Sequence, residues 1–470
     1  MKKIQILLVS MASASAAFAI DIDIKPGELE RLIDEKVITE ESLVMKGAID
    51  ARDLAAIEHL PAGVINLDMS NVNIEKLTLS TKKYFGKTLF TAGELPSYTF
   101  FKSGLETLSL PVGVKTIGEG AFSASSLKQI VIPDGVESIG DYAFYGCVDL
   151  ESVTLPSTLK ALGKGAFGNC HKLKKVNFSG SQLSELPEKT FAGCVELGNI
   201  NLPSSLVKIG KEAFTHTQIS KLDLSNIKEF EVYALSGMPY LETLAINPAV
   251  AEVNGLLMDD ISLISLTGIP DNLPDYFAAN CTSMDTNDLV SSIRTIGKYS
   301  LANQEGAKSI LLGTGITSLD RGAISGNALG SIDVTALRGE VPSVGPTTFE
   351  GIDQKSVSLI INDDDYDTWA NAPYWQNFML KKASATVVNP VEAGGNEDIS
   401  ISLNGGTLNI ESGFTLNDVK VFSTDGQLLY SVNPNDQRIG IPTDIFTSGI
   451  IIVRATNEKN SIKSATVMMK

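Results

Sequence analysis

Apolar positions recur with a fixed period through the middle of the chain. Six copies of a short signature begin at intervals of 22 to 24 residues, and from Leu95, Ile117, Ile139, Leu162, Leu186 and Ile209 they read LPSYTF, IGEGAF, IGDYAF, LGKGAF, LPEKTF and IGKEAF. Each copy is followed by a second pattern, Leu-x-x-apolar-x-apolar, as in Leu150, Val153 and Leu155. A fixed period of this length is typical of a solenoid, in which neighbouring units stack because none buries its apolar face alone.

The second pattern predicts short strands that stack into one parallel sheet, with the first, fourth and sixth positions pointing inward. The Phe of the signature is expected to fill the core from the opposite, looped side, at Phe122, Phe144, Phe167, Phe191 and Phe214. The period persists in weaker form as far as VGPTTF, which starts at Val344. The fold class is therefore a repeat solenoid over residues 95–382, with a terminal cap near 357–382.

The third and fifth strand positions point outward and are candidate contacts for a partner. They include Gln129, Thr154, Lys175, Asn177, Asn199, Asn201, Lys221 and Asp223. These residues are small or polar and include no aromatic side chain, which favours hydrogen-bonded contact with a protein over sugar stacking. The alternative is that they form an ordinary solvated sheet face.

No residue pattern for catalysis or for a cofactor is found. The three histidines, His59, His171 and His216, are scattered, and no metalloprotease, phosphate-loop or nucleophile-elbow motif occurs. The spacing of Gly163, Gly165 and Gly168 resembles a dinucleotide fingerprint, but the next repeats lack it, so we assign these glycines to a solenoid turn. We expect no enzymatic activity, no cofactor and no metal.

Three of the four cysteines occupy one repeated position. Cys147, Cys170 and Cys194 each follow the signature Phe by three residues, and Cys281 lies in a similar context. Stacked parallel side chains fit disulfide geometry poorly, so we expect a ladder of buried free thiols. A disulfide or a metal site is the alternative.

An acidic run at residues 363–367 is followed by both tryptophans of the chain, Trp369 and Trp375. The acidic residues are expected to precede a short helix, whose N-terminus favours negative charge, with a calcium site as the alternative. The aromatic residues are expected to close the end of the solenoid core. The alternative is an exposed platform for sugar stacking.

The two ends of the chain have different compositions from the repeats. Residues 1–19 have the basic, apolar and small-residue regions of a signal peptide with cleavage after Ala19, and 20–94 are expected to form a partly helical N-terminal cap. Residues 383–398 have the composition of a linker. In 399–470, alternating segments around Asp425 and Gly426 predict a hairpin within a small β-sandwich.

The formal net charge of −17 makes nucleic acid and anionic membranes poor partners. After the signal peptide, no segment is long and apolar enough for a membrane span. The expected location is therefore outside the cytoplasm, either secreted or on the cell surface.

The repeats IGDYAFYGC…LESVTLP and LGKGAFGNC…LKKVNF resemble the BspA-type leucine-rich repeats of bacterial surface antigens. VNGLLMDDISLISLTG, from Val253, is similar to the hairpin-like rung that interrupts such arrays, and the segments from Leu43 and Val357 resemble the leading and terminal caps. The resemblance covers residues 43–382. It implies an exported or surface-bound protein of a host-associated bacterium, in a family in which some members are adhesins for host proteins.

The segment 399–470 resembles the C-terminal sorting domains by which some Gram-negative anaerobes carry cargo across the outer membrane. It departs from them at GIIIV, residues 449–453, where the family has an aromatic residue after the Gly. The sequence thus predicts a non-enzymatic surface protein that binds a host or bacterial surface protein, as an adhesin or an interaction scaffold. A glycan-capture protein and a passive envelope protein are the alternatives.

Overall fold

The computed structural model describes residues 6–7, 19–178, 180–250, 253–284, 293–304, 308–326, 329–383, 399–404, 407–423, 428–446, 449–458 and 462–469. It divides into two compact units, and each is described by itself. The first comprises Met1–Pro270 and Pro274–Met284, and the second comprises Asp271–Leu273 and Asp285–Lys470. The predicted signal peptide lies almost entirely outside the described residues, so its cleavage stays a prediction.

The first unit begins with the two-residue strand β1 (Ile6–Leu7), which pairs antiparallel with β2 (Ala19–Ile24). Three parallel strands follow in the sheet, namely β2, β3 (Ser42–Ile49) and β4 (Asn66–Ile74). The helices α1 (Leu29–Asp34), α2 (Ala51–Ala56) and η1 (Ile57–His59) lie between them in the chain. Asp50 starts α2 with a capping box that is completed by Asp53. The buried Asp53 carboxylate also accepts hydrogen bonds from the backbone of Gly27 and Leu29, at 2.6 and 2.9 Å, which joins the two helices.

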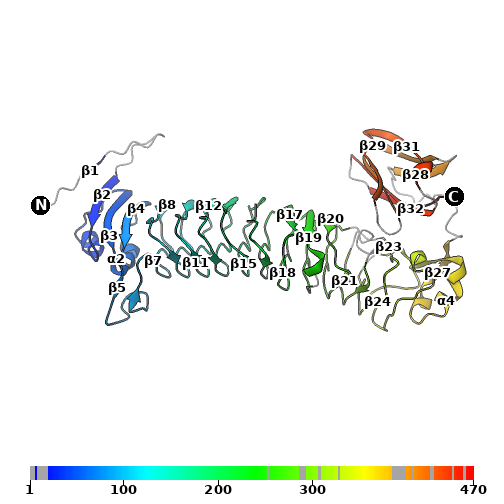
Figure 1. Cartoon of the computed structure of the whole chain (residues 1–470), viewed down its shortest axis with the longest axis horizontal. Coiled ribbons are helices and arrows are strands. Elements are labelled where there is room, and N and C mark those ends of the chain that lie inside the picture. Colours follow the sequence, from blue (N-terminus) through cyan, green and yellow to red (C-terminus); the bar gives the residue numbers. More distant parts are fainter. Residues whose placement is uncertain are drawn as a thin grey trace. The chain divides into compact units, whose positions relative to one another are not determined.

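The strands of the repeats continue this sheet. β4 pairs in parallel with β8 (Thr107–Ser109), followed by β10 (Gln129–Val131), β12 (Ser152–Thr154) and β14 (Lys175–Asn177) (Figure 1). A second sheet contains β17 (Lys221–Leu224), β19 (Thr243–Ile246) and β20 (Ser265–Thr267). The inward positions, such as Leu150, Val153 and Leu155, are buried as predicted. The solenoid of stacked parallel strands is confirmed, and its strand ladder is divided into shorter sheets.

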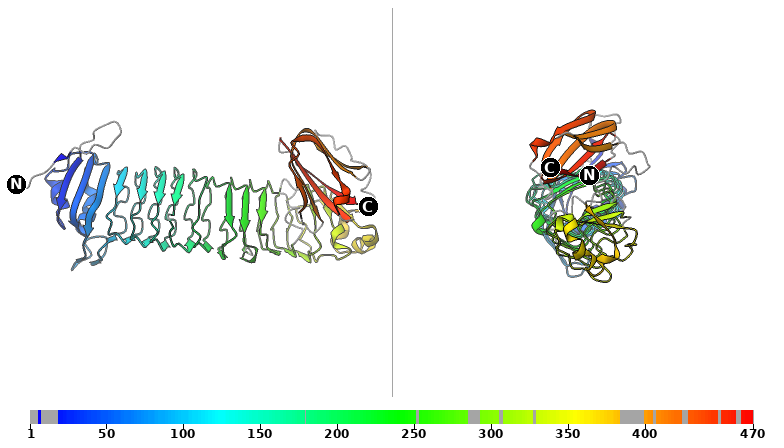
Figure 2. Two further views of the ribbon diagram at one scale, coloured as in Figure 1. Left: turned by 45° about the horizontal axis from the view of Figure 1, so that its top comes forward. Right: turned by 90° about the vertical axis from the view of Figure 1, so that its right-hand side faces the viewer.

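The opposite side of each repeat carries its own ladder of two-residue strands. One sheet contains β7 (Glu94–Leu95), β9 (Thr116–Ile117), β11 (Ser138–Ile139) and β13 (Ala161–Leu162), and another contains β15 (Glu185–Leu186), β16 (Lys208–Ile209) and β18 (Glu229–Phe230). Figure 2 shows the rungs of the first unit following one another. Here "rung" means one repeat, and "turn face" means positions four to eight of a repeat, counted from the first letter of its signature.

The backbone of the turn face is hydrogen-bonded between rungs. In the rung of Tyr142, the N–H groups of positions four, six and eight donate to carbonyls of the next rung, from Tyr142 to Lys164, Phe144 to Ala166 and Gly146 to Gly168. Positions four and eight have positive φ, as in Tyr142 at 54° and Gly146 at 71°. The turns therefore satisfy backbone groups that a looser loop would leave to water.

The signature phenylalanines form one stack through the core. Six rings from Phe100 to Phe214 follow one another with centroids 4.7 to 6.1 Å apart and ring planes within 12° of parallel. All six rings are fully buried. The predicted role of these residues as the filling of the core is confirmed.

The rung from Val253 differs from the predicted hairpin. Its strand β20 pairs in parallel with β19, with Ser265 opposite Thr243, and Leu256, Leu257 and Leu263 are buried at the ordinary repeat positions. Because these three leucines match the core spacing, the rung stacks on its neighbour as the others do.

The second unit continues the repeat pattern. The two-residue strands are β21 (Asn272–Leu273), β22 (Thr295–Ile296) and β24 (Ser318–Leu319), and the longer ladder is β23 (Ser309–Leu311), β25 (Ser331–Asp333), β26 (Ser358–Ile361) and β27 (Met379–Lys382). Between β26 and β27 lie η4 (Asp363–Asp365), α4 (Tyr366–Ala370) and η5 (Trp375–Asn377). The acidic run thus precedes a helix as predicted, although no side chain caps α4.

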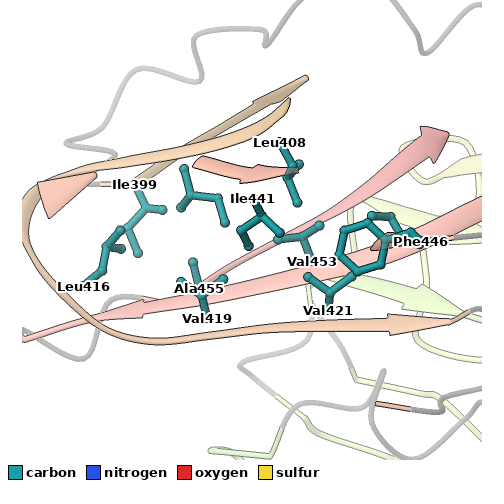
Figure 3. Close-up of a cluster of buried hydrophobic side chains, with 11 residues drawn as sticks. Ile399, Leu408, Leu416, Val419, Val421, Ile441, Phe446, Val453 and Ala455 are labelled. Carbon is teal, nitrogen blue, oxygen red and sulfur yellow. The ribbon is translucent and has the colours of Figure 1, made fainter. Parts of the chain in front are cut away.

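The segment after 398 forms an antiparallel sheet. Its strands are β28 (Ile399–Asn404), β29 (Thr407–Ser423), β30 (Leu428–Val432), β31 (Asp436–Pro442), β32 (Gly449–Asn457) and β33 (Ile462–Met469). The first part of β29 pairs with β28 and β31, and its second part pairs with β30 and β32. Figure 3 shows side chains from both parts of β29, including Leu408 and Val421, within one buried cluster.

The predicted hairpin in this segment is present, because Val421 on β29 lies opposite Tyr430 on β30. Its predicted turn at Asp425 and Gly426 lies outside the described residues.

Candidate functional site

Half of the predicted contact residues come together on the first sheet. Gln129 lies opposite Ser152 on β12, and Ser152 lies opposite Lys175 on β14. In the next column, Thr154 lies opposite Asn177. Gln129, Thr154, Lys175 and Asn177 thus form a polar sheet patch, and the apolar Val131 beside Thr154 is 67% exposed.

The other four predicted residues lie outside this patch. Asn199 and Asn201 are exposed in a segment that forms no strand, while Lys221 and Asp223 lie on β17 of the second sheet. The Asp223 carboxylate accepts hydrogen bonds from the hydroxyl and the backbone N–H of Ser225, which lower its pKa. The turn after β17 therefore occupies one of its carboxylate oxygens.

Aromatic side chains are exposed on the turn face of the first unit. Tyr98 and Phe101 are 51% and 46% exposed, and two rungs along the solenoid Tyr142 and Tyr145 are 37% and 40% exposed. Each pair meets edge to face, with centroids 5.9 and 5.7 Å apart. With a rung spacing of about 4.8 Å, the two pairs are about 10 Å apart. We call these four residues the aromatic pairs.

Four tyrosines at position four lean over a glycine at the same position of the next rung. A Cβ atom added to Gly165 would lie 2.7 Å from Cε1 of Tyr142, and Gly165 has a φ of 58°. The same relation joins Tyr98 with Gly120, Tyr233 with Gly255, and Tyr299 with Gly322. Tyr98 and Tyr142, one from each aromatic pair, are therefore held in place by packing on the following rung.

The alternation of outward strand positions did not predict this surface, because the aromatic pairs lie in the turns. The signal was present in the successive signatures SYTF, EGAF, DYAF and KGAF, where Tyr alternates with Gly at position four. An alternation between a large and a small residue at one stacked position indicates that the large side chain covers the small one.

A recess also lies on the turn face of the first unit. It has a volume of about 380 Å³, and the residues around it include Lys211, His216, Tyr233, Met258 and Asp259. The other two histidines, His59 and His171, are exposed. Among the described residues, no group of three or more His, Cys, Asp or Glu side chains could hold a metal ion.

The cysteines are buried and free, as predicted. The thiols of Cys147, Cys170 and Cys194 point to carbonyl oxygens of the preceding rung at 3.0 to 3.1 Å, and Cys281 makes the same contact with Leu257 at 2.9 Å. Burial raises the pKa of the Cys170 thiol well above its ordinary value. Because the thiols act as hydrogen-bond donors within the core, their role is structural.

Both tryptophans are fully buried, so the exposed sugar-stacking platform considered for them is wrong. Trp369 and Trp375 meet edge to face at 5.3 Å, and Trp375 also packs on Phe349 and Phe378. The indole N–H of Trp375 donates to the carbonyl of Pro342 at 3.1 Å. The cluster provides apolar core and offers no surface to a ligand.

The chain matches the model of a known repeat family. Six copies of the BspA type leucine-rich repeat region cover residues 93–186, 179–276 and 261–355, which together span more than half of the chain. No curated protein matches the sequence. Within the described residues, no helix has both the length and the apolar character needed to cross a bilayer.

Comparison with solved structures gives one match in fold and several weaker matches. A leucine-rich repeat protein from Bacteroides ovatus is 19% identical with a TM-score of 0.54, and the match covers 81% of this chain and 98% of that one. The pneumococcal vaccine antigen PcpA is 20% identical, with a TM-score of 0.41 and coverage of 65% and 88%. A leucine-rich repeat protein of T. pallidum is 27% identical, with a TM-score of 0.32 and coverage of 36% and 81%. The repeat matches over residues 93–355 place the chain in the BspA-type leucine-rich repeat family, whose members are repeat scaffolds that bind other proteins.

Proposed function

We propose that this chain is an exported, non-enzymatic surface protein that binds a host or bacterial surface protein through its solenoid. The observation that carries the proposal is the pair of exposed aromatic contacts on the turn face, Tyr98 with Phe101 and Tyr142 with Tyr145. Family membership supports it, because proteins with BspA-type repeats are typically secreted or surface-bound.

Aromatic side chains favour protein contact for two physical reasons. They bury a large area with few rotatable bonds, and they are enriched at the energetic centres of protein interfaces. Tyr142 and Tyr145 are also ordered before binding, since one packs over Gly165 and the other accepts a hydrogen bond from the side-chain amide of Asn169 at 2.7 Å. A side chain that is already ordered loses little conformational entropy when a partner covers it.

The test measures binding of the purified full chain to a panel of extracellular matrix proteins by biolayer interferometry. Replacing Tyr98 and Tyr142 by Ser removes one ring from each pair, and we expect at least a tenfold weaker Kd, which corresponds to about 1.4 kcal/mol. Tyr374→Ser is the matched control, because Tyr374 lies between α4 and η5, outside the aromatic pairs, and its side chain is 38% exposed. Saturable binding that the double variant retains would place the contact elsewhere on the chain.

The sheet patch is the second candidate surface for the same function, and charge-changing variants distinguish it from the turn face. Lys175→Glu together with Asn177→Asp would weaken binding if the patch contacts the partner, because an unpaired charge in an interface is costly. Absence of saturable binding to any protein by the wild-type chain would refute the proposed function itself.

We further propose that residues 1–19 direct export and that the C-terminal sheet acts as a sorting domain. The antiparallel sheet of β28–β33, with its own buried core, supports an independently packed sorting module. The test compares cells that express the chain with and without residues 399–470, using protease added to intact cells and N-terminal sequencing of the exported protein. We expect the exported protein to begin at Ile20 and its surface exposure to require residues 399–470. Unchanged surface exposure of the truncated chain would contradict the sorting role.

A further inference from the structure

The recess on the turn face exists because one side chain is missing from a stacked row. Gly237 lies at position eight of its rung, between His216 and Asp259 at position eight of the neighbouring rungs. Its φ of 72° and lack of a Cβ leave a notch, which we name the Gly237 notch.

Another glycine in the same row is covered. A Cβ atom on Gly193 would lie 2.2 Å from Oδ1 of Asn169, because that side chain leans over it. At Gly237 the three nearest atoms all belong to Thr215, at 3.1 to 4.0 Å, so His216 does not fill the equivalent space. Gly146, in the same row, also has no atom within 4 Å of an added Cβ, so the Gly237 notch is distinguished by the residues that line it and not by the open glycine alone.

The walls of the Gly237 notch combine an aromatic ring, an apolar stem and a carboxylate. Tyr233 and Met258 supply the ring and the stem. Asp259 is exposed, its Oδ1 accepts a hydrogen bond from the amide of Asn280 at 2.7 Å, and no Lys or Arg among the described residues forms an ion pair with it. The neighbouring Glu212, in contrast, is already paired with Lys189 and Lys211, at 3.3 and 3.4 Å.

The ring of Tyr233 already contacts a cation of the same chain, the ammonium group of Lys211. Nζ of Lys211 lies 5.6 Å from the centroid of Tyr233, within the range of a cation–π contact. Among the residues that line the notch, Lys211 carries one positive charge and Glu212 and Asp259 carry two negative charges, so the lining is acidic. The net charge of −17 adds a long-range attraction for basic surfaces.

We propose that the Gly237 notch receives an arginine side chain of the partner protein. A guanidinium group is planar, weakly hydrated and always charged, so it can pair with Asp259 and lay its apolar stem against Met258. It would contact the edge of the Tyr233 ring, because the ring packs on Gly255 and Lys211 lies over it. The inference rests on the proposed function and names one contact of that interface. It identifies the partner as a protein with an exposed arginine on a basic surface.

Met258 provides a local reporter for the test. The full chain is labelled with ¹³C at its methionine methyl groups, of which there are 10, and the Met258 signal is assigned with Met258→Leu. N-acetyl-arginine methylamide is then titrated, with the citrulline compound as a neutral isostere. We expect arginine to shift the Met258 signal in a saturable way, and citrulline to shift it at least tenfold less.

Two variants with the same charge change complete the design. Asp259→Asn should abolish the arginine shift, whereas Asp134→Asn, which neutralises an exposed carboxylate outside the notch, should leave it unchanged. Equal shifts with arginine and citrulline, or an arginine shift that survives Asp259→Asn, would overturn the proposal. So would a saturable Met258 shift with glucose or N-acetylglucosamine and none with arginine.

Failure of this inference can be separated from failure of the proposed function. If Asp259→Asn leaves binding to a matrix protein intact while the tyrosine double variant weakens it, the notch is not a contact and the function stands. If the wild-type chain binds no protein, the function itself fails.

Discussion

Replacing Phe167 by Ala tests whether the phenylalanine stack holds neighbouring rungs together. Phe167 lies in the middle of the stack, fully buried, with its ring centroid 5.1 Å from that of Phe144 and 5.7 Å from that of Phe191. Truncation removes the ring from both contacts and leaves a cavity that the rigid backbone ladder on either side cannot fill.

The expected loss is large for a single side chain. A buried Phe→Ala change costs about 3–5 kcal/mol, and the loss of two ring contacts, each worth about 0.5–1.5 kcal/mol, favours the upper half of that range. Because each rung contacts only its neighbours, the loss should be local. Phe101→Ala is the matched control, since this ring is 46% exposed and makes one edge contact, with Tyr98. We expect it to cost about 1 kcal/mol.

Hydrogen exchange measured by mass spectrometry locates the effect, because a single unfolding free energy is poorly defined for a long repeat array. In Phe167→Ala, peptides within residues 140–195 should lose protection by a factor of at least 100, which corresponds to about 2.8 kcal/mol. Peptides within 399–469 should be unchanged. Equal losses for Phe167→Ala and Phe101→Ala, or a uniform loss over the whole chain, would refute the stacking argument.

Three further predictions concern a crowded glycine, a buried carboxyl group and the four cysteines. Gly165→Ala should lower the melting temperature, because Ala at positive φ costs about 1–2 kcal/mol and its Cβ meets the Tyr142 ring. Adding Tyr142→Ser should recover only the part of this loss that comes from the clash with the ring. Gly63→Ala, at an uncrowded position, is the control. Burial raises the pKa of Asp260 well above its ordinary value, so this group destabilises the fold as pH rises above its unfolded pKa of about 3.9. Asp260→Asn should therefore gain stability over wild type from acid to neutral pH in urea melts, while the exposed control Asp134→Asn should not; a gain that does not depend on pH would contradict this. The four buried cysteines should react with a thiol reagent only after urea unfolds the chain, and fast labelling of the native protein would show that the thiol ladder is open.

Much of the fold followed from the sequence because stacking imposes identical constraints on each rung. The spacing of Phe144 and Phe167 indicated a common core position, and the three cysteines that follow the Phe were correctly interpreted as free buried thiols. The exception within the solenoid is the rung from Val253. Its resemblance to an interrupting hairpin predicted a break in the stack, whereas its leucines keep the core spacing and its strand pairs in parallel with β19.

The candidate surfaces were less predictable, because exposure depends on the neighbouring rung as well as on the residue itself. Outward strand positions could be chosen by alternation, and two of the chosen residues, Thr154 and Asn177, lie opposite each other on β12 and β14. The sequence alone did not separate Lys221 from that sheet, because it did not reveal the break in the ladder around Asn199. Nor did it exclude an exposed Trp369, since an aromatic residue near the end of a solenoid can either close the core or face solvent.

The sequence by itself determined the repeat, its period and the residues that fill its core, because a side chain that recurs once per rung must stack on its own copies. Only the tertiary structure decided the shape of the turn face. There the packing of Tyr142 over Gly165 and the opening at Gly237 depend on which side chain of one rung reaches across the backbone of the next. Periodicity defines which positions are neighbours, whereas contacts between unlike side chains at those positions decide what a partner can touch.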